Sequence, residues 1–582
     1  MSNRAGRRNQ PGSGETGWMI LGGLLAFVLV VVVGWWGAAL LDSSITGPAA
    51  ATDPITIISG QATGALPVTI LQIAVFTAML LVVLGLTGLI VVAALRQRSK
   101  STWADRLARS MSRPKDHQEF FEKAATADAE KLGATGASIG PPLGRLVINN
   151  KIMRASWEWV QVWVIGPRGG KTQNVCVPQI LETNGPVVAT SNKPDIVDLT
   201  RRPRMMRGQV WVHDVQGIIG EEPSWFWNPL SFVEDIESAE KLADTFVSSA
   251  TSAARPSDGY FESDGKRLLS YLLLAAAVAE VSVDEVYNWA NDPDDPAPVR
   301  ALEQAGKVQI AEGLSRIQGI TPKQRDGIYG TMRPWISVLG SDKVIPWLRD
   351  TGAPGQVEFD HRNFHATTDT LYLISREGGG SARAITAALA MAVLSSAEKY
   401  ASTHGGRLKT PLMAVLDETA NVVRWRELPD LYSHYGSRGI VVSTFFQSFV
   451  QGEEAFGKEG MSKLWSAANI RVAGSGLSEA QFGSFLSRQV GPRDVVKRSV
   501  STQSRGRSTS TSVQREQIFD EADIGAMPRF RALMFSSGHR PALLKLRHFS
   551  ETEHAASVKE SQEYYEGLRE YTRSQTTSTG GR

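Results

Sequence analysis

The chain has 582 residues, which is long enough for more than one folding unit. Its 62 Lys and Arg nearly balance its 59 Asp and Glu, for a formal net charge of +3, so overall charge does not indicate nucleic-acid binding and any such surface must be local. The single cysteine, Cys176, excludes an internal disulfide framework and a multi-cysteine metal site. We expect it to pack as a small apolar residue on one helix face.

Two apolar runs near the N-terminus predict membrane-spanning helices at residues 18–41 and 68–95. Each exceeds the roughly 20 helical residues that a hydrocarbon core of ~30 Å requires. Trp18 lies at one end of the first run and Trp35 and Trp36 near the other, where indole rings prefer the membrane interface. A cleaved signal peptide is the alternative, but its apolar region would be only about 7–15 residues long.

Flanking positive charge orients the two spans, because Lys and Arg resist translocation. Residues 42–67 between the runs contain Asp42 and Asp53 and no basic residue, which predicts a short extracytoplasmic loop. We therefore expect a multi-pass protein of the cell membrane with two spans and both termini cytoplasmic. The basic residues that flank the pair of runs are Arg4, Arg7 and Arg8 before the first and Arg96, Arg98 and Lys100 after the second.

Residues 96–144 are predicted to be a cytoplasmic linker region, in which 102–131 is charged and favours helix and is followed by a stretch rich in Gly, Ala and Pro. Strand signals follow at 146–148 and 157–165, then a glycine-rich turn, a short helix at 172–182 and a strand at 186–190. Strand, glycine loop, helix and strand form the βαβ unit of nucleotide-binding sheets. Pro178 should kink the helix. Another short strand is expected at 209–213.

Residues 232–349 favour helices with few strands, at 233–250, 260–280, 284–290 and 321–339. Strand signals return at 370–374, 412–416 and 440–444. This order predicts an α/β sheet with an all-helical insertion rather than two consecutive domains. The Ser, Thr and Arg-rich segment 499–511 and the stretch from Ser550 onward are expected to be mobile.

The turn GPRGGKT at residues 166–172 resembles a phosphate-binding loop. Glycines allow backbone N–H groups to close around an anion, a lysine meets the terminal phosphates, and a hydroxyl holds magnesium. Three residues rather than four separate the outer glycines, with Ile165 where the first glycine is usual. A glycine turn with an incidental lysine is the alternative. The residues that fit the nucleotide-binding roles are Gly166, Gly169, Gly170, Lys171 and Thr172.

Polar side chains follow two further apolar strands. Asp417 and Glu418 end the 412–416 strand, where one carboxylate can reach magnesium and the other can activate water. An acidic pair after a strand also often caps the next helix. Gln447 follows the 440–444 strand and is suited to orient the attacking water or sense a γ-phosphate. An ordinary polar residue at a strand end is the alternative for Gln447.

Two arginines are candidates to stabilise transition-state charge in a neighbouring subunit. Arg438 precedes the 440–444 strand, and a surface ion pair is its commoner role. Arg376, which follows the strand at 370–374, is a weaker candidate.

The motifs of the chain, and the order in which they occur, are similar to those of the type IV secretion coupling proteins, the TraG/TraD-like conjugative DNA transfer ATPases. After the two apolar runs come GPRGGKT, NVCVPQIL, SNKPDIVDLT, WNPLS, MAVLDETANV and SRGIVVSTFFQS. The resemblance implies ATP and Mg²⁺ as cofactors, with Lys171 and Thr172 on ATP, Thr172 and Asp417 on magnesium, Glu418 as the catalytic carboxylate and Gln447 as sensor. For Arg438 it implies a trans-acting finger.

The resemblance also implies a fold and an organisation. The fold is an α/β, RecA-like P-loop NTPase sheet with an all-α inserted domain, preceded by two transmembrane helices. We divide the chain into a cytoplasmic N-terminus (1–17), spans at 18–41 and 68–95 around the loop 42–67, a linker (96–144), the nucleotide-binding domain (145–231 and 351–549), the all-α domain (232–350) and a polar tail (550–582).

Implied partners are DNA, relaxase or secreted protein substrates, channel components of the secretion system, the membrane and further copies of the chain in a hexamer. A pump that drives DNA is the leading function. A membrane-anchored docking scaffold with little nucleotide turnover is the second, and an FtsK-type translocase the third. The run Arg201, Arg202, Arg204 and Arg207 is a candidate DNA-binding surface, although a solvated helix face is the usual meaning of such a run.

Overall fold

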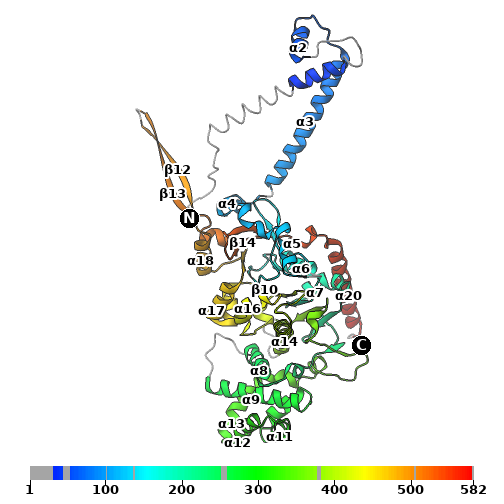
Figure 1. Ribbon diagram of the computed structural model, residues 1–582, viewed down its shortest axis with the longest axis vertical. Coiled ribbons are helices and arrows are strands. Elements are labelled where there is room, and N and C mark those ends of the chain that lie inside the picture. Colours follow the sequence, from blue (N-terminus) through cyan, green and yellow to red (C-terminus); the bar gives the residue numbers. More distant parts are fainter. Residues whose placement is uncertain are drawn as a thin grey trace. The chain divides into compact units, whose positions relative to one another are not determined.

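The computed structural model describes residues 31–42, 53–99, 101–134, 138–250, 259–376, 382–503 and 506–579. The chain forms two compact units, Met1–Thr102 and Trp103–Arg582. Figure 1 shows the elements of both units.

The N-terminal unit contains one described helix that is long and apolar enough to cross a membrane. This segment, Ile70–Leu89, has a mean hydropathy of 2.4 and lies within α3 (Ile70–Ser99). The helix Val31–Asp42 is shorter than a span requires. The predicted span at 18–41 is therefore not shown as a whole, and its residues 18–30 lie outside the described part of the chain. The short helix α2 (Pro54–Ala62) forms within the predicted extracytoplasmic loop.

Polar and aromatic contacts join the helices of this unit. The Trp35 indole N–H donates to Gln61 Oε1 at 2.8 Å, and Gln61 Nε2 donates to Gln72 Oε1 at 2.7 Å. The Trp35 ring packs edge-on against Phe76 with 5.1 Å between centroids. Because Gln72 is only 1% exposed, its side-chain amide depends on these partners for hydrogen bonding.

The second unit is built on one mixed sheet of eleven strands in the order β2-β1-β15-β14-β11-β3-β10-β9-β4-β8-β5. From β11 to β5 all neighbouring strands are parallel, and β14, β15, β1 and β2 add antiparallel pairs. This confirms the predicted α/β class. The strands are β1 (Pro142–Leu146), β2 (Ile152–Arg154), β3 (Gln161–Val164), β4 (Val187–Ser191), β5 (Val210–His213), β8 (Thr370–Ile374), β9 (Leu412–Leu416), β10 (Ile440–Phe446), β11 (Ile470–Gly474), β14 (Arg531–Ser536) and β15 (Ala542–Lys545).

Each face of the sheet is covered by helices, so its central strands are continuously apolar. Alternate residues of β3 enter opposite core layers, Val162 and Val164 one and Trp163 the other. Cys176 lies fully buried in the second layer, as expected. The helices around the sheet are α4 (Trp103–Met111), α5 (Glu122–Lys131), α6 (Val177–Glu182), α7 (Asp195–Met205), α14 (Ala382–Thr403), α15 (Thr419–Val422), α16 (Leu428–Ser437), α17 (Phe449–Ala467), α18 (Ala480–Val490) and α19 (Glu521–Gly525).

An all-helical segment lies between β5 and β8 in the sequence, and Figure 1 shows its helices gathered at one end of the unit. Its helices pack through buried Leu, Trp and Met side chains. α11 and α12 were not among the predicted helices. The helices are α8 (Ile236–Ala250), α9 (Gly259–Val278), α10 (Asp284–Asn291), α11 (Ala297–Gln304), α12 (Val308–Gly319) and α13 (Pro322–Ile336), beside a minor strand pair β6 (Trp225–Phe226) and β7 (Val357–Glu358).

The helix-favouring part of the predicted linker region, 102–131, contains α4 and α5, and Asp105 of α4 accepts two hydrogen bonds from Arg531 at 2.6 and 2.9 Å. Two other segments differ from the sequence prediction. The segment 499–511, expected to be mobile, belongs to the paired strands β12 (Pro492–Gln503) and β13 (Gly506–Gln517). The polar tail forms α20 (Ala555–Thr579), which packs on α7. In α20, Arg569 pairs with Asp198.

The arginine run in α7 does not form one free basic surface. Arg204 is fully buried, and its guanidinium donates to backbone carbonyls of Thr183 and Gly185 that end α6. Arg207 also donates to the Thr183 carbonyl, at 2.6 Å. Arg201 and Arg202 form ion pairs with glutamates at 2.8 and 3.0 Å. The run does not form the candidate DNA-binding surface, because the guanidinium groups bond to backbone carbonyls and glutamates of the same chain.

Candidate functional site

The glycine loop between β3 and the following helix is tightly constrained. The Gly166 N–H donates to the Ser475 carbonyl at 3.0 Å, and a Cβ at Gly166 would lie 2.0 Å from the Gly476 carbonyl oxygen. Gly170 has φ of +88°, and a Cβ there would lie 2.3 Å from Asn174 Nδ2. Both positions therefore require glycine. The loop forms in spite of its shortened glycine spacing.

The helix after the loop begins with an unusual turn. Thr172–Cys176 is a π-helical turn that continues directly into α6. Pro178 lies just after this turn, inside the continuous helical segment 172–182, where it has no N–H to bond to the preceding turn. The irregularity expected from Pro178 therefore occurs as a wide turn just before it, and π-turns are frequent at functional sites.

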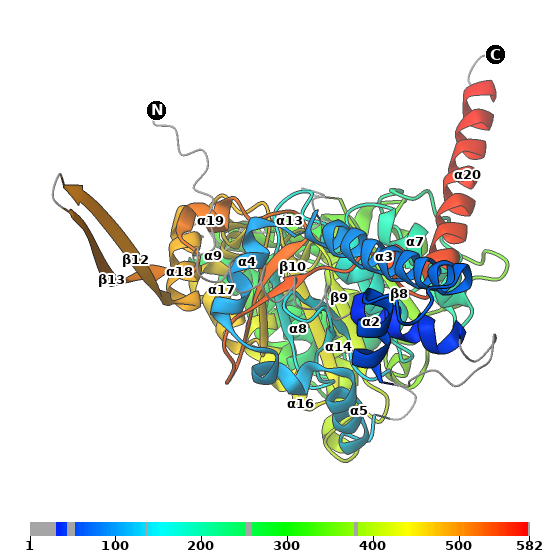
Figure 2. The same ribbon diagram turned by 90° about the horizontal axis from the view of Figure 1, so that it is seen from above.

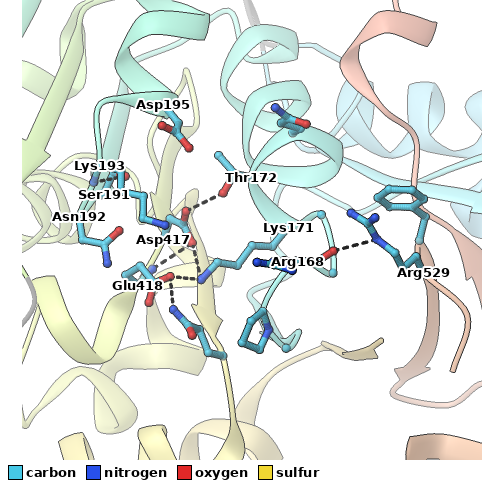
Figure 3. A pocket seen from close by; sticks show the side chains of 17 residues that line it. Arg168, Lys171, Thr172, Ser191, Asn192, Lys193, Asp195, Asp417, Glu418 and Arg529 are labelled. Carbon is cyan, nitrogen blue, oxygen red and sulfur yellow. Dashed lines mark hydrogen bonds and ion pairs between the residues drawn. The ribbon is translucent and has the colours of Figure 1, made fainter. Parts of the chain in front are cut away.

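Lys171 and Thr172 contact the acidic pair that follows β9, as Figure 3 shows. Lys171 Nζ lies 3.2 Å from Asp417 Oδ1 and also forms an ion pair with Glu418 Oε1. Thr172 Oγ1 donates to Asp417 Oδ2 at 3.1 Å. The loop and the acidic pair lie 245 positions apart in sequence, and the parallel sheet brings them together because β3 and β9 both flank β10.

Glu418 has a strained backbone. Its φ of 55° and ψ of 42° lie in the left-handed region, which costs a non-glycine residue about 1–2 kcal/mol. Asp417, directly before it, is held by Thr190 Oγ1 of β4, which donates to its carbonyl at 2.6 Å. Strain of this kind persists where surrounding structure enforces it, and it is common at active sites.

Gln447 completes the group from the end of β10. Its Nε2 donates to Glu418 Oε1 at 2.8 Å, and its backbone N–H donates to Gln451 Oε1 at 2.9 Å. The side-chain amide therefore meets the same carboxylate oxygen as Lys171. The ends of β3, β9 and β10 thus deliver a cation, two carboxylates and an amide to one place.

The electrostatics of the site are those of buried, coupled charges. Burial lowers the pKa of Lys171, but the neighbouring Asp417 and Glu418 carboxylates outweigh it and hold the pKa above its ordinary value. Burial raises the pKa of Asp417 above its ordinary range, although Lys171 opposes that shift. Asp417 and Glu418 are 3% and 4% exposed. Without a cation, two carboxylates this deeply buried would be costly.

A pocket of about 470 Å³ opens over these residues and is large enough for a small ligand. Its wall includes a contribution that the sequence analysis missed, Arg529 and Phe530 from the turn before β14. Arg529 Nε donates to the Arg168 carbonyl at 3.2 Å, and its guanidinium lies 5.0 Å from the Phe530 ring centroid. An Arg-Phe dipeptide before a strand is not a recognisable sequence motif, so nothing in the sequence indicated this part of the pocket. The other lining residues are Gly166, Pro167, Arg168, Gly169, Gly170, Lys171, Thr172, Gln173, Ser191, Asn192, Lys193, Asp195, Asp417, Glu418 and Gln447.

The two candidate arginines do not line this pocket. Arg438 precedes β10, so it lies at the opposite end of that strand from Gln447. Its Nη1 donates to the Gly406 carbonyl at 3.0 Å. Arg376 follows β8 at the same sheet edge as the pocket and is exposed. Within one chain, neither arginine contacts the group around Lys171.

Comparison with known proteins supports the resemblance seen in the sequence. A family model described as the TraM recognition site of TraD and TraG matches residues 411–529. Two conjugal transfer proteins TraG, from Rhizobium radiobacter and Agrobacterium fabrum, are each 20% identical over 65% of this chain. Over these parts the chain is similar to the TraG/TraD family of type IV secretion coupling proteins. The aligned part spans 60% and 58% of those relatives' lengths.

Solved structures show the same fold. The unbound monoclinic form of the bacterial conjugative coupling protein TrwB, without its N-terminal segment, matches with a TM-score of 0.53 and 16% identity. The match covers 72% of this chain and 91% of that one. A trigonal form of TrwB in complex with sulphate has a TM-score of 0.50 at 16% identity and covers 67% and 86%. The α/β fold predicted for the nucleotide-binding sheet is therefore confirmed.

Proposed function

We propose that this protein is a coupling protein of the TraG/TraD type, a membrane-anchored, ATP-hydrolysing motor that recruits DNA or nucleoprotein substrates and drives them into a secretion channel. One observation carries the proposal. A lysine and a hydroxyl from a glycine loop, two carboxylates and a glutamine converge on one pocket at the carboxyl ends of parallel strands, where α/β sheets bind ligands. P-loop NTPases use this set of groups for phosphoryl transfer.

The glycine loop is the part that would bind the phosphates of ATP. A side chain at Gly166 or Gly170 would collide with backbone or with Asn174, so the loop packs against its neighbours more closely than other residues allow. Lys171 is the group suited to meet the terminal phosphates, because its raised pKa keeps it charged. To reach them it must exchange its contact with Glu418 for the phosphate.

Thr172 and Asp417 would hold Mg²⁺. Their adjoining oxygens, 3.1 Å apart, are the hard ligands that Mg²⁺ takes, and few protein ligands suffice because phosphates and water complete its shell. Among the described residues no cluster of three His, Cys, Asp or Glu side chains forms a self-sufficient metal site. Mg²⁺ would supply neutralisation of the charge that develops on the phosphates.

Glu418 is the proposed general base and Gln447 the residue that positions the attacking water. Once Lys171 leaves Glu418 Oε1, that oxygen is free to accept a proton from water, while Gln447 remains within hydrogen-bond reach of it at 2.8 Å. We propose Arg438 as a finger only toward the site of a neighbouring copy, because within one chain it lies at the far end of β10.

The wider assembly forms the remainder of the proposal. A homo-hexamer would let loops lining a central passage contact the DNA backbone without reading its bases. The family model that matches residues 411–529 supports recognition of a partner from the DNA-processing complex. Anchoring would rest on α3, whose segment Ile70–Leu89 is long enough to span, and on the apolar run at 18–41 as a second span with both termini cytoplasmic.

ATPase measurements on the full-length protein, with and without DNA, test the proposal. Lys171→Ala and Glu418→Gln should each lower DNA-stimulated hydrolysis at least a hundredfold, while Glu418→Gln keeps nucleotide binding. The control is Lys399→Ala, an exposed lysine of α14 outside the pocket. Nucleotide-dependent assembly without hydrolysis in the wild type would instead favour a docking scaffold and refute the motor.

A further inference from the structure

The strands β12 and β13 form a long, isolated two-stranded ribbon. They pair antiparallel from Pro492 opposite Gln517 to Gln503 opposite Gly506, and twelve residues of strand extend about 40 Å. Figures 1 and 2 show the ribbon leaving the body of its unit near α18. A two-stranded hairpin alone in water is marginally stable at best. Such a ribbon is therefore expected to lie against a partner surface.

One face of the ribbon combines exposed apolar and basic side chains. Val496 lies opposite Val513, and the two are 65% and 66% exposed. Because side chains alternate along a strand, Arg498 shares the face of Val496, with Thr511 opposite it. Arg498 is exposed and has no ion-pair partner among the described residues. The two opposed valines and the unpaired Arg498 on one face suit a partner surface that is both anionic and partly apolar.

The charge of the segment favours an anionic partner over another copy of this chain. Residues 492–517 carry six basic residues and two acidic ones, a net charge of +4, whereas the whole chain carries +3. The remainder of the chain is thus close to neutral and offers no matching negative charge overall. The charged residues are Arg493, Lys497, Arg498, Arg505, Arg507, Arg515, Asp494 and Glu516.

The base of the ribbon is attached to the first helix of its unit. The ring of Phe519, two residues after β13, packs on Trp103, the first residue of α4, with 6.0 Å between centroids. Arg493 Nη1 donates to Ser110 of α4 at 3.3 Å. Trp103 follows Ser99, the last residue of α3, by four residues, which span at most about 14 Å. The base of the ribbon therefore contacts a residue that is only four positions along the chain from the end of α3.

We propose that the ribbon face with Val496, Arg498 and Val513 lies on the headgroups of an anionic bilayer leaflet, the one from which α3 emerges. The inference rests on the membrane anchoring in the proposed function. Basic residues near such a surface are attracted to it, each raising the bound-to-free ratio roughly fivefold. The two valines would enter the interface between headgroups and acyl chains, which duplex DNA does not offer along its phosphates.

A label on the ribbon tests this in the full-length protein reconstituted into nanodiscs. Because Cys176 is fully buried, an environment-sensitive dye on Val513→Cys reports on one site. We expect a blue shift and at least twofold stronger quenching by spin-labelled lipid with phosphatidylglycerol than with phosphatidylcholine alone. The same label on Val450→Cys, an exposed site on α17, should not change. Arg498→Glu should lower the ratio of lipid-bound to unbound ribbon at least fivefold, and the control Arg316→Glu on α12 should leave that ratio unchanged.

Other outcomes would overturn the proposal, each in its own way. If the protein stays in the nanodisc but the dye on the ribbon gives equal signals in both lipid compositions, the ribbon proposal is overturned and membrane anchoring is upheld. Loss of the protein from the nanodisc would overturn anchoring and this inference together. A response to duplex DNA in neutral nanodiscs, without a response to anionic lipid, would assign the ribbon to nucleic acid. A response that depends only on protein concentration would assign it to a second copy.

Discussion

Removal of the Lys171 ammonium should destabilise the protein in a way that depends on pH. In the structure Lys171 is the cation that pairs with Asp417 and Glu418, both nearly fully buried. Breaking a buried ion pair by removing one partner costs about 3–5 kcal/mol. Because water can enter this open pocket, we expect Lys171→Ala to lower the free energy of unfolding by about 3 kcal/mol, the lower end of that range.

The pH dependence follows from the carboxylates left behind. Burial already raises the pKa of Asp417, and loss of Lys171 removes the main influence that opposes this. An acid whose pKa is higher in the folded than in the unfolded protein costs stability when ionised, and the cost falls as pH drops through the folded pKa. The deficit of Lys171→Ala should therefore be largest at pH 8 and shrink toward pH 5.

Thermal melting of the nucleotide-free protein measures the effect. An unfolding entropy of about 2 cal/mol/K per residue over the roughly 480 residues of Trp103–Arg582 converts 3 kcal/mol to a decrease of about 3 °C. The matched control is Lys193→Ala, an exposed lysine of the same pocket. Adding Glu418→Gln to Lys171→Ala should restore part of the loss. Equal melting of the two lysine variants at pH 8 would refute the reasoning.

Two further substitutions test the loop and the C-terminal helix. Gly170→Ala should weaken nucleotide binding at least tenfold in a titration with a fluorescent ATP analogue, because φ at this position is +88°; Gly330→Ala, which has open space around its Cβ position, should leave binding unchanged. Arg569→Ala removes the bidentate contact of α20 with Asp198, worth about 2 kcal/mol, and limited proteolysis should then cleave α20 faster. Lys559→Ala, an exposed change on the same helix, should not accelerate cleavage.

The sequence predicted the parts of the sheet and site that depend on local patterns. The strand at 412–416 was expected with the bounds that β9 has, because a short apolar run that ends in charged residues is a strong local signal. The glycine loop likewise indicated Lys171 and Thr172. Their convergence with Asp417 followed from the rule that parallel strands present their carboxyl ends at one edge.

Features that depend on distant partners were not predictable in this way. The Ser, Thr and Arg-rich composition of 499–511 is typical of mobile segments, but pairing with the neighbouring strand makes it a ribbon. α20 has few apolar residues, and polar contacts such as Ser561 Oγ to the Asp198 carbonyl at 2.5 Å help to dock it. Arg204 is buried because its donors reach carbonyls on other elements. Composition alone contains no information on these partners.

Lys171 links the stability of the site to its proposed chemistry. In the structure the ammonium forms an ion pair with Glu418 Oε1, the oxygen that the proposed mechanism needs as a base. Its charge makes two buried carboxylates tolerable, and the same contact keeps Glu418 from accepting a proton. A triphosphate that drew Lys171 away would free Glu418, and Mg²⁺ held by Asp417 and Thr172 would supply positive charge in place of the ammonium. On the proposed mechanism, release of the base would then be conditional on the ligand whose hydrolysis it catalyses, with Gln447 beside that base at 2.8 Å.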